Sequence, residues 1–342
     1  MIPARFQFGD LTVPVVAAPM AGGPSTPQLA AAATNAGGLG FVAAGYLSVD
    51  DFADRLAAAQ RQSSGPLGAN LFVPQGSLGN GEEVERYAQT LAGEAQRRGV
   101  ELGTPRYSDD NFAAKLDVVL DLRPAVVSFT FDVPNAEQLR RVTQAGIVTA
   151  ATVTSASEAE LALSRGVDAL VVQGPEAGGH RGTYDPTAQP NSQPLRELLA
   201  AVVGRVDVPV VAAGGLMTAA DVDEVLRAGA IAAQLGTAFL LSDEAGSSGL
   251  HRAALQSPQF TETAVTRAFS GRYARGLRNR FIDEYEARAP FGYPEIHYLT
   301  SPLRAAAVRA EDPHGTNVWA GTGFPKAKAA PVAAIMAELS CR

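Results

Sequence analysis

The chain has 342 residues, of which 46% are hydrophobic and 18% charged, and its formal net charge at pH 7 is -7. A chain of this length can bury a large core, as one large domain or as two ordinary ones. The acidic balance and the scattered basic residues argue against a nucleic-acid partner and against an anionic membrane surface.

The cysteine content and the N-terminus indicate a cytoplasmic protein. Cys341 is the single cysteine, which excludes a disulfide framework and a cysteine-based metal site. The opening segment "MIPARFQFGD" does not have the pattern of a signal peptide. No apolar run reaches the roughly 18 residues that a membrane helix needs, so we expect no membrane partner.

Short apolar, β-branched runs alternate with alanine-rich amphipathic stretches along most of the chain. The apolar runs predict strands at 11–20, 39–45, 66–73, 124–131, 145–153, 167–174, 208–215 and 230–237. The amphipathic stretches predict helices at 26–38, 48–62, 111–121, 157–165 and 218–229. Thr26 and Ser48 stand where helix N-caps are expected.

Eight strands, nearly all followed by a helix, within roughly 240 residues predict a (β/α)8 TIM barrel. Continuous apolar runs are typical of parallel strands that are buried on both faces. A doubly wound sheet is the alternative, but it seldom needs eight such regular repeats.

Two segments depart from the strand–helix repeat. Residues 74–110 form a polar, Gly-rich insertion after the third strand, with a helix expected at 82–98, and residues 243–342 form a tail of helices and loops. We expect both to cover the mouth of the barrel. The chain is accordingly divided into a barrel domain, 1–242, and a C-terminal substrate-side extension, 243–342.

Glycine pairs follow the last two predicted strands. Gly214 and Gly215 precede a helix, and Gly236 and Thr237 open another helical stretch. Bare backbone amides at a helix N-terminus bind phosphate, and barrel enzymes often hold a phosphate in the loops after strands seven and eight. Tight turns alone would explain either pair, but both pairs together favour a phosphate site.

Two side-chain amides also end apolar strands. Asn70 follows the third strand and Gln173 the sixth, and each could pair with the donor and acceptor edges of a flat heterocycle. Either residue alone would more often be a turn residue with satisfied hydrogen bonds. Beside a phosphate site, the two indicate an aromatic phosphate cofactor such as FMN.

The stretch "VVQGPEAGGHRG" places His180 on a loop just beyond the sixth strand. Gly178 and the glycine after it let the backbone approach a planar ring, and His180 is presented at the same mouth. A histidine there can accept a proton or bind an anion near neutral pH. The three other histidines share no metal-ligand spacing, so we predict no metal site.

The segment 38–43, "GLGFVA", matches the dinucleotide pattern G-x-G-x-x-A. That motif must follow a strand and open a helix. Here it follows a helix and opens a strand, so we interpret it as a turn. The chain contains no Walker loop and no G-x-S-x-G nucleophile elbow.

Four blocks of the sequence resemble the signature blocks of class I nitronate monooxygenases, formerly called 2-nitropropane dioxygenases. They are "APMAGGPSTPQLAAAATNAGGLGFVAAGYLS", "VVSFTF", "QGPEAGGHRGTY" and "PVVAAGGLMTAADVDEVLRAGAIAAQLGTAFL". The resemblance extends to "FIDEY", "YPEIHYLTSPLRAAA" and "NVWAGTG" in the tail, so it spans most of the chain.

The resemblance implies an FMN-bound barrel that oxidises alkyl nitronates, such as propionate 3-nitronate, with O2 to a carbonyl compound and nitrite. This detoxification needs no nicotinamide cofactor. The active-site histidine is implied to be His180. The implied FMN contacts are Met20, Asn70, Gln173, Gly178, Gly215, Gln234, Gly236 and Thr237. We also expect Tyr298 in the tail to line the substrate pocket, although no motif matches it residue by residue.

Two other functions stay open at this point. One is an NAD(P)H-dependent flavin reductase of the same barrel type, acting on a quinone or an enoyl thioester. The other is a non-catalytic flavin-binding protein, which the full set of strand-end residues argues against. A homo-oligomer is compatible with the sequence, and its size is not predicted.

Overall fold

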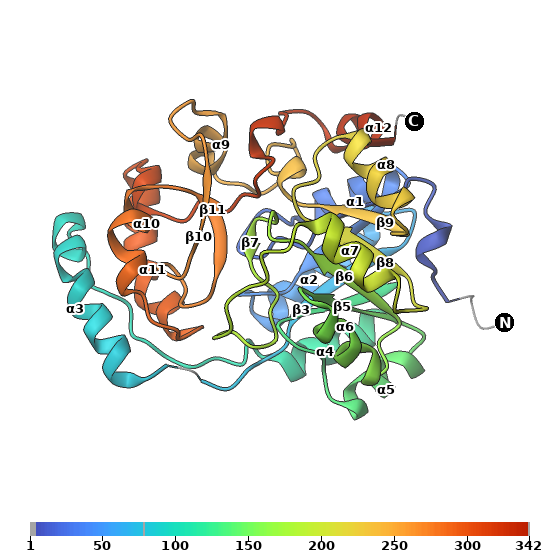
Figure 1. Ribbon diagram of the computed structural model, residues 1–342, viewed down its shortest axis with the longest axis horizontal. Coiled ribbons are helices and arrows are strands. Elements are labelled where there is room, and N and C mark those ends of the chain that lie inside the picture. The colour runs from blue at the N-terminus through green and yellow to red at the C-terminus, as the bar shows by residue number, and fades with distance from the viewer. Residues whose placement is uncertain (1–4, 78, 341–342) are drawn as a thin grey trace.

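The computed structural model describes residues 5–77 and 79–340; Cys341 lies outside them. Eight parallel strands close into a barrel in the order β1-β2-β3-β4-β5-β6-β8-β9 (Figure 1). Their bounds are β1 Val15–Ala17, β2 Leu39–Ala43, β3 Leu67–Phe72, β4 Val126–Thr130, β5 Val148–Val153, β6 Ala169–Gln173, β8 Val210–Ala213 and β9 Ala232–Leu235. The barrel closes where Val16 of β1 pairs with Gln234 of β9. The predicted (β/α)8 barrel is confirmed.

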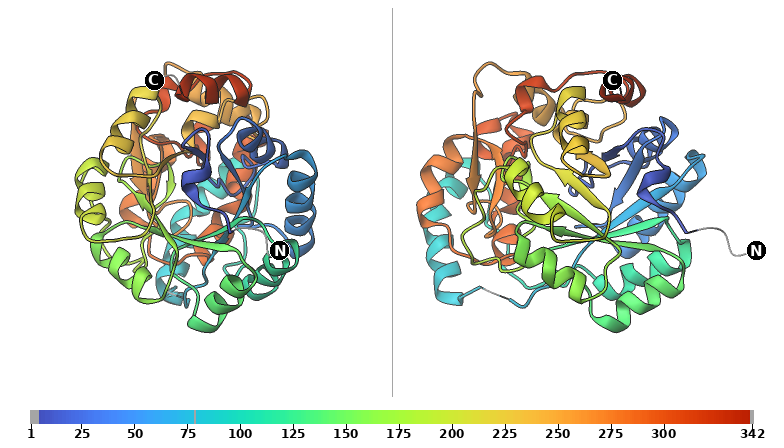
Figure 2. Two further views of the ribbon diagram at one scale, coloured as in Figure 1. Left: turned by 90° about the vertical axis from the view of Figure 1, so that its right-hand side faces the viewer. Right: turned by 45° about the vertical axis from the view of Figure 1, so that its right-hand side comes forward.

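Helices surround the barrel, as the left-hand view of Figure 2 shows. Those that follow its strands are α1 Pro27–Asn35, α2 Val49–Gln62, α4 Phe112–Leu122, α5 Ala136–Gln144, α6 Ala156–Ser164, α7 Leu195–Val203 and α8 Ala219–Arg227. The Thr26 side chain accepts from the amide of Leu29, and Ser48 accepts from that of Asp51. Both predicted N-caps therefore begin their helices.

The place beside α1 and α8 is filled by the last helix of the chain, α12 (Val332–Ser340), which contacts both. Val332 and Met336 of α12 are fully buried in the same core as the barrel helices. This helix therefore belongs to the barrel wall and not to the cover expected from residues 243–342. The chain leaves the barrel after β9, builds the cover and then returns.

The cover contains a small sheet in addition to helices. Strands β10 (Thr263–Thr266) and β11 (Ala274–Leu277) pair antiparallel, and β11 also pairs with β7 (Gly179–His180). The surrounding helices are α9 Gly249–Gln256, α10 Arg280–Tyr285 and α11 Glu295–Arg309. Short 3-10 helices lie at Phe8–Asp10 (η1), Thr237–Phe239 (η2), Glu286–Arg288 (η3), Pro313–Gly315 (η4) and Phe324–Lys326 (η5). The sequence did not predict the sheet, because β7 has two residues and its partner lies far along the chain.

The insertion after β3 forms one body with this cover. Its helix α3 (Gly81–Arg98) packs against α11 (Figure 1). Buried side chains from both helices share a core separate from that of the barrel, including Leu91 and Leu299. The buried Glu94 of α3 forms an ion pair with Arg280 of α10, with 2.8 Å between nitrogen and oxygen. Segments from two distant parts of the chain therefore build one cover.

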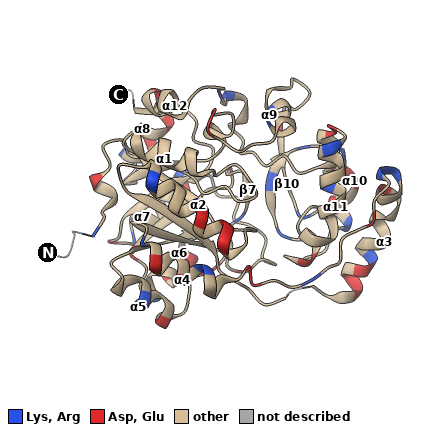
Figure 3. Ribbon diagram, turned by 180° about the vertical axis from the view of Figure 1, so that it is seen from behind, with Lys and Arg blue, Asp and Glu red and all other residues tan. Residues whose placement is uncertain are grey.

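Acidic and basic residues are interspersed over the outer helices (Figure 3). No helix within residues 5–77 and 79–340 is both long and apolar enough to cross a bilayer.

Candidate active site

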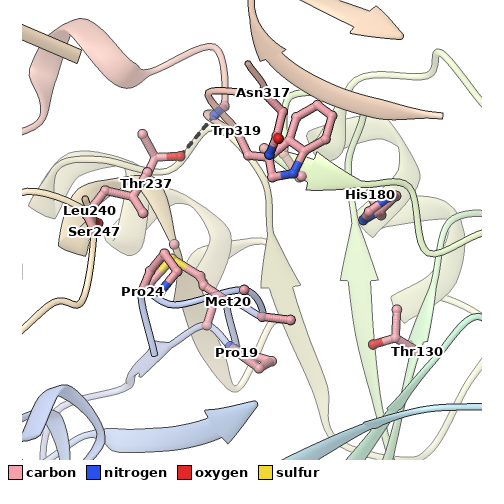
Figure 4. A pocket seen from close by; sticks show the side chains of 18 of the residues that line it. Pro19, Met20, Pro24, Thr130, His180, Thr237, Leu240, Ser247, Asn317 and Trp319 are labelled. Carbon is pink, nitrogen blue, oxygen red and sulfur yellow. Dashed lines mark hydrogen bonds between the residues drawn. The ribbon is translucent and has the colours of Figure 1, made fainter. Parts of the chain in front are cut away.

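A cavity of about 530 Å³ lies at the carboxyl ends of the barrel strands. Its volume is in the range of small-molecule and cofactor sites. Side chains from the barrel and from the cover both line it (Figure 4). All of the FMN contacts implied by the resemblance, together with His180, contribute to its wall: Met20, Asn70, Gln173, Gly178, Gly215, Gln234, Gly236 and Thr237.

One edge of the cavity is made of backbone amides. Gly214 and Gly215 have φ angles of +123° and +72°, which favour glycine. Within the described part of the chain, their N–H groups and those of Gly236 and Thr237 have no hydrogen-bond acceptor. A Cβ on Gly215 would come within 2.9 Å of Glu176 Cβ. The loop thus offers several free donors and cannot accept a side chain without adjustment.

Asp221 closes a capping box at the start of α8. Its Oδ2 accepts from the amides of Met217 and Thr218, at 2.9 Å each, and its own amide donates to Thr218 Oγ1 at 3.3 Å. These amides are therefore not available to an anion. The free donors of the loop before the helix are those of Gly214 and Gly215.

The two predicted side-chain amides differ in what they can offer. The Nδ2 group of buried Asn70 donates to Ser128 Oγ at 2.9 Å and to Thr130 Oγ1 at 3.1 Å, which directs the amide nitrogen away from any ligand. Gln173 uses both ends: its Nε2 donates to the His180 carbonyl at 3.1 Å, and its Oε1 accepts from Gly182 N at 2.8 Å. Gln173 therefore holds the backbone on both sides of Arg181 in place.

His180 lies in an aromatic surrounding at the other side of the cavity from Thr237 (Figure 4). Its ring centroid is 5.4 Å from that of Tyr293 and 5.7 Å from that of Trp319. Burial, and then the positive charges of Arg272 and Arg304, lower the pKa of His180 from 6.5 to about 3. The imidazole is therefore neutral at physiological pH and can accept a proton.

Ser270 is the hydrogen-bond partner of the His180 ring. His180 Nε2 lies 2.9 Å from Ser270 Oγ, and the Arg272 carbonyl lies 3.2 Å from the same hydroxyl. When the hydroxyl donates to the carbonyl, it accepts from Nε2–H, and Nδ1 is then the unprotonated nitrogen.

The cover adds cavity residues that were not among the predicted site residues. His251, Ser270, His297, Arg304 and Trp319 all line the wall. The seven-residue spacing of His297 and Arg304 places them on one face of α11, a signal that could have identified them together. No group of three or more His, Cys, Asp or Glu side chains in the described residues is arranged to hold a metal ion.

Burial keeps two of these histidines neutral as well. It lowers the pKa of His251 to about 4, and His251 Nε2 lies 3.0 Å from the Trp319 carbonyl. Burial, with the charge of Arg304, lowers the pKa of His297 to about 2. The His297 ring stacks on Tyr46 at 4.4 Å with an interplanar angle of 2°.

Tyr298 does not line this cavity. Its ring lies under the guanidinium of Arg106, 4.3 Å from the carbon to the ring centroid, and it borders a second, smaller cavity of about 30 Å³. The neighbouring His297 is the side chain that contacts the main cavity.

A family model described as nitronate monooxygenase matches residues 7–341. A probable nitronate monooxygenase of Staphylococcus aureus strain MRSA252 is 36% identical over 340 residues, covering 97% of this chain and 95% of the relative. The structure of nitroalkane oxidase from Streptomyces ansochromogenes superimposes with a TM-score of 0.92 at 46% identity, covering 97% and 96% of the two chains.

FabK from Thermotoga maritima superimposes with a TM-score of 0.72 at 22% identity, covering 97% of this chain and 93% of FabK. That likeness concerns the fold alone. The family match over nearly the whole chain and the identity to its curated members show that this chain belongs to the nitronate monooxygenase family and is an oxidoreductase of nitronates or nitroalkanes.

Proposed function

We propose that the protein binds FMN and oxidises alkyl nitronates with O2 to a carbonyl compound and nitrite. One observation carries this proposal: a single cavity has a row of free backbone amides at one side and a neutral histidine at the other. Two nitronates and one O2 balance two carbonyl compounds and two nitrites, so the overall reaction requires no nicotinamide.

The residues of the cavity fit FMN. Free amides at Gly214, Gly215, Gly236 and Thr237 suit one phosphate group. No Asp or Glu is among the described residues that line the cavity. When bound, the flavin would accept electrons from the substrate. Asn70 and Gln234 would contact its ring, and Met20 would lie beside it.

His180 then has different tasks for two forms of substrate. A nitronate is already an anion, so its oxidation needs positioning and charge stabilisation more than a base. A neutral nitroalkane must first lose its α-proton, and His180, which lies in the cavity wall on the loop after β6, is the acceptor we propose. A structural neighbour is named a nitroalkane oxidase, which supports including this second form.

We also propose the division of labour between the two parts of the chain. The barrel, residues 1–242, would hold the cofactor through β3, β6, β8 and β9. The extension, from residue 243 to the segment before α12, would complete the substrate side together with the insertion 74–110. The cavity residues from the cover support this assignment.

Oxygen uptake by the purified protein with an alkyl nitronate, with and without NADPH, tests the proposal. We expect uptake without NADPH and accumulation of nitrite. The bound pigment, released by heat and separated by chromatography, should be FMN. Turnover that requires NADPH would favour a flavin reductase acting on a quinone or an enoyl thioester, and protein without flavin would overturn the proposal.

A further inference from the structure

The cavity wall has an unusual charge content. Arg304 is the single Arg or Lys among the described residues that line it, and that lining includes no Asp or Glu. The three histidines in the wall are held neutral by burial. The cavity therefore carries one fixed positive charge and no negative charge of its own.

Arg304 is held by neutral groups alone. Its Nε donates to Thr300 Oγ1 at 3.1 Å, its Nη1 to Asn317 Oδ1 at 3.2 Å, and its Nη2 to the His297 carbonyl at 2.8 Å. Burial lowers the pKa of Arg304 to about 10, so the side chain stays charged at neutral pH. Asn317 uses one of the two N–H groups on Nη1, which leaves the second as a free donor.

Other buried charges in the described residues are either ion-paired or lie outside the cavity. Glu94 is paired with arginines of α3 and α10. Arg181 and Arg272 donate to the backbone carbonyls of Gly174 and Thr183, and neither lines the cavity. A desolvated charge without a counter-ion costs several kcal/mol. Arg304 is thus a cation that faces a ligand cavity without an ionic partner in the described residues.

We propose that Arg304 is the anion-binding group of this cavity and holds the planar oxyanion group of the substrate beside His180. A guanidinium suits such a group because it is planar, permanently charged and weakly hydrated. Identifying the anion as a nitronate rests on the proposed function. The binding of a planar oxyanion at Arg304 does not depend on that function.

The geometry separates this site from the phosphate edge. Arg304 belongs to α11, and its neighbour His297 stacks on Tyr46 after β2. The free amides lie after β8 and β9, and Thr237 and His180 stand at opposite sides of the cavity (Figure 4). His180 is connected to this site through Tyr293, whose ring lies 5.4 Å from that of His180 and whose hydroxyl donates to Tyr46 at 3.1 Å. An anion at Arg304 would therefore lie near His180 rather than at the glycine loops.

The position also gives Arg304 a part in the reaction of a neutral nitroalkane. When the Cα–H bond breaks, the proton moves to the unprotonated ring nitrogen of His180. The electron pair of that bond forms the C=N double bond of the nitronate, and the charge settles on the two nitro oxygens. A fixed cation beside those oxygens stabilises the charge as it develops.

Calorimetric titration of the flavin-loaded enzyme with sodium nitrate, a planar oxyanion that cannot be oxidised, tests the site directly. We expect Arg304→Met to weaken nitrate binding by about 10- to 100-fold, the usual effect of losing one charge-assisted contact. The KM for an alkyl nitronate should rise by a similar factor. Arg309→Met is the matched control, because Arg309 is an exposed arginine on the same helix outside the cavity.

Several outcomes would overturn the assignment. The wild-type enzyme could bind no nitrate, or the Arg304→Met enzyme could bind nitrate with unchanged affinity. The Arg304→Met enzyme could also have lost FMN, which would place Arg304 at the phosphate. If Arg304→Met fails to fold, Arg304→Gln keeps a donor for Thr300 Oγ1 and gives the same test. Nitrate binding that depends on Arg304, in an enzyme without nitronate turnover, would support the anion site and refute the proposed function.

Discussion

At the scale of single residues, His180 combines a position on the barrel with hydrogen-bonding and charged partners from the cover. Its place on a glycine-rich loop after an apolar strand identified it as a candidate base. Its chemistry depends on Ser270, which contacts Nε2, and on burial together with Arg272 and Arg304, which lower its pKa. These partners lie about 90 residues or more along the chain, and no local pattern connects them to His180.

Replacing His180 by Asn should separate the two substrate forms. Turnover of a neutral nitroalkane should fall to near background, since its α-proton has no acceptor. Nitronate turnover should fall less, by about 10- to 100-fold, the effect of one lost contact to a charged group. Anaerobic flavin reduction by each form, followed by stopped flow, measures both losses.

His251→Asn provides the control, because it removes another buried histidine of the same cavity. The His251→Asn substitution should not change the turnover of the nitroalkane relative to that of the nitronate. Equal losses for both substrates in His180→Asn would remove the assignment of His180 as the base.

At the scale of elements, the barrel was predictable because its signals are local. Each barrel strand is a buried apolar run, and Thr26 and Ser48 accept the hydrogen bonds that begin α1 and α2. Strands β10 and β11 were missed, since their sequences, TAVT and ARGL, are not continuous apolar runs and the two strands depend on each other for pairing. The loop before α8 ends as the sequence predicts, but the capping box in which Asp221 accepts from the amides of Met217 and Thr218 was not foreseen.

The Gly214–Gly215 loop predicts an effect on cofactor retention. Gly215→Ala introduces strain at φ +72° and places a Cβ within 2.9 Å of Glu176 Cβ, so the loop must move and its amides shift. FMN affinity should drop by about tenfold or more. Dilution of the loaded enzyme, followed by flavin fluorescence, measures the release.

Gly166→Ala is the matched control for backbone strain. Gly166 also has a positive φ, +90°, but a Cβ there would have no neighbour within 4 Å. Both variants should lose roughly 1 kcal/mol of stability. Equal FMN affinities in the two variants would argue against a phosphate at this loop.

The cover predicts where substrate size is controlled. Trp319 lines the cavity, with its ring 5.7 Å from that of His180. Trp319→Leu should therefore raise the kcat/KM of long-chain nitronates relative to short ones by about tenfold. Tyr298→Leu is the comparison, because Tyr298 packs under Arg106 outside the cavity. A change in preference with Tyr298→Leu alone would restore the role first expected for Tyr298.

At the scale of the whole molecule, the sequence identified the cover only as the two segments that depart from the strand–helix repeat. That reasoning separated 74–110 and 243–342 from the barrel, and α3 does pack on α11. It could not show that α12 returns to the barrel, because α12 looks like any apolar helix until α1 and α8 are in place. The cover side of the cavity, Arg304 included, follows from this three-dimensional arrangement.

Three buried histidines make the stability of the whole fold depend on pH. In the folded chain, the pKa values of His180, His251 and His297 are about 3, 4 and 2, all below the unfolded value of about 6.5. Between about pH 6.5 and pH 4 the unfolded chain binds protons that the folded chain does not. Stability should therefore fall as pH is lowered through this window.

Denaturant titrations at several pH values between 7 and 4.5 measure this dependence. His251→Gln should flatten it by removing one of the three groups, and it keeps a side-chain donor for the Trp319 carbonyl. One titrating group changes the free energy of unfolding by at most about 1.4 kcal/mol per pH unit. Identical slopes in the two proteins would show that His251 does not contribute.

The pairing of β7 with β11 has a consequence for how such enzymes can diverge. His180 belongs to the barrel by sequence, but its backbone is a strand of the sheet in the cover, through the register Ala274↔His180. A barrel that exchanged its cover would keep the glycine loops after β8 and β9 and would lose the alignment of its base. Recombination can therefore give this barrel a new substrate range only with a cover that presents a matching strand edge to β7.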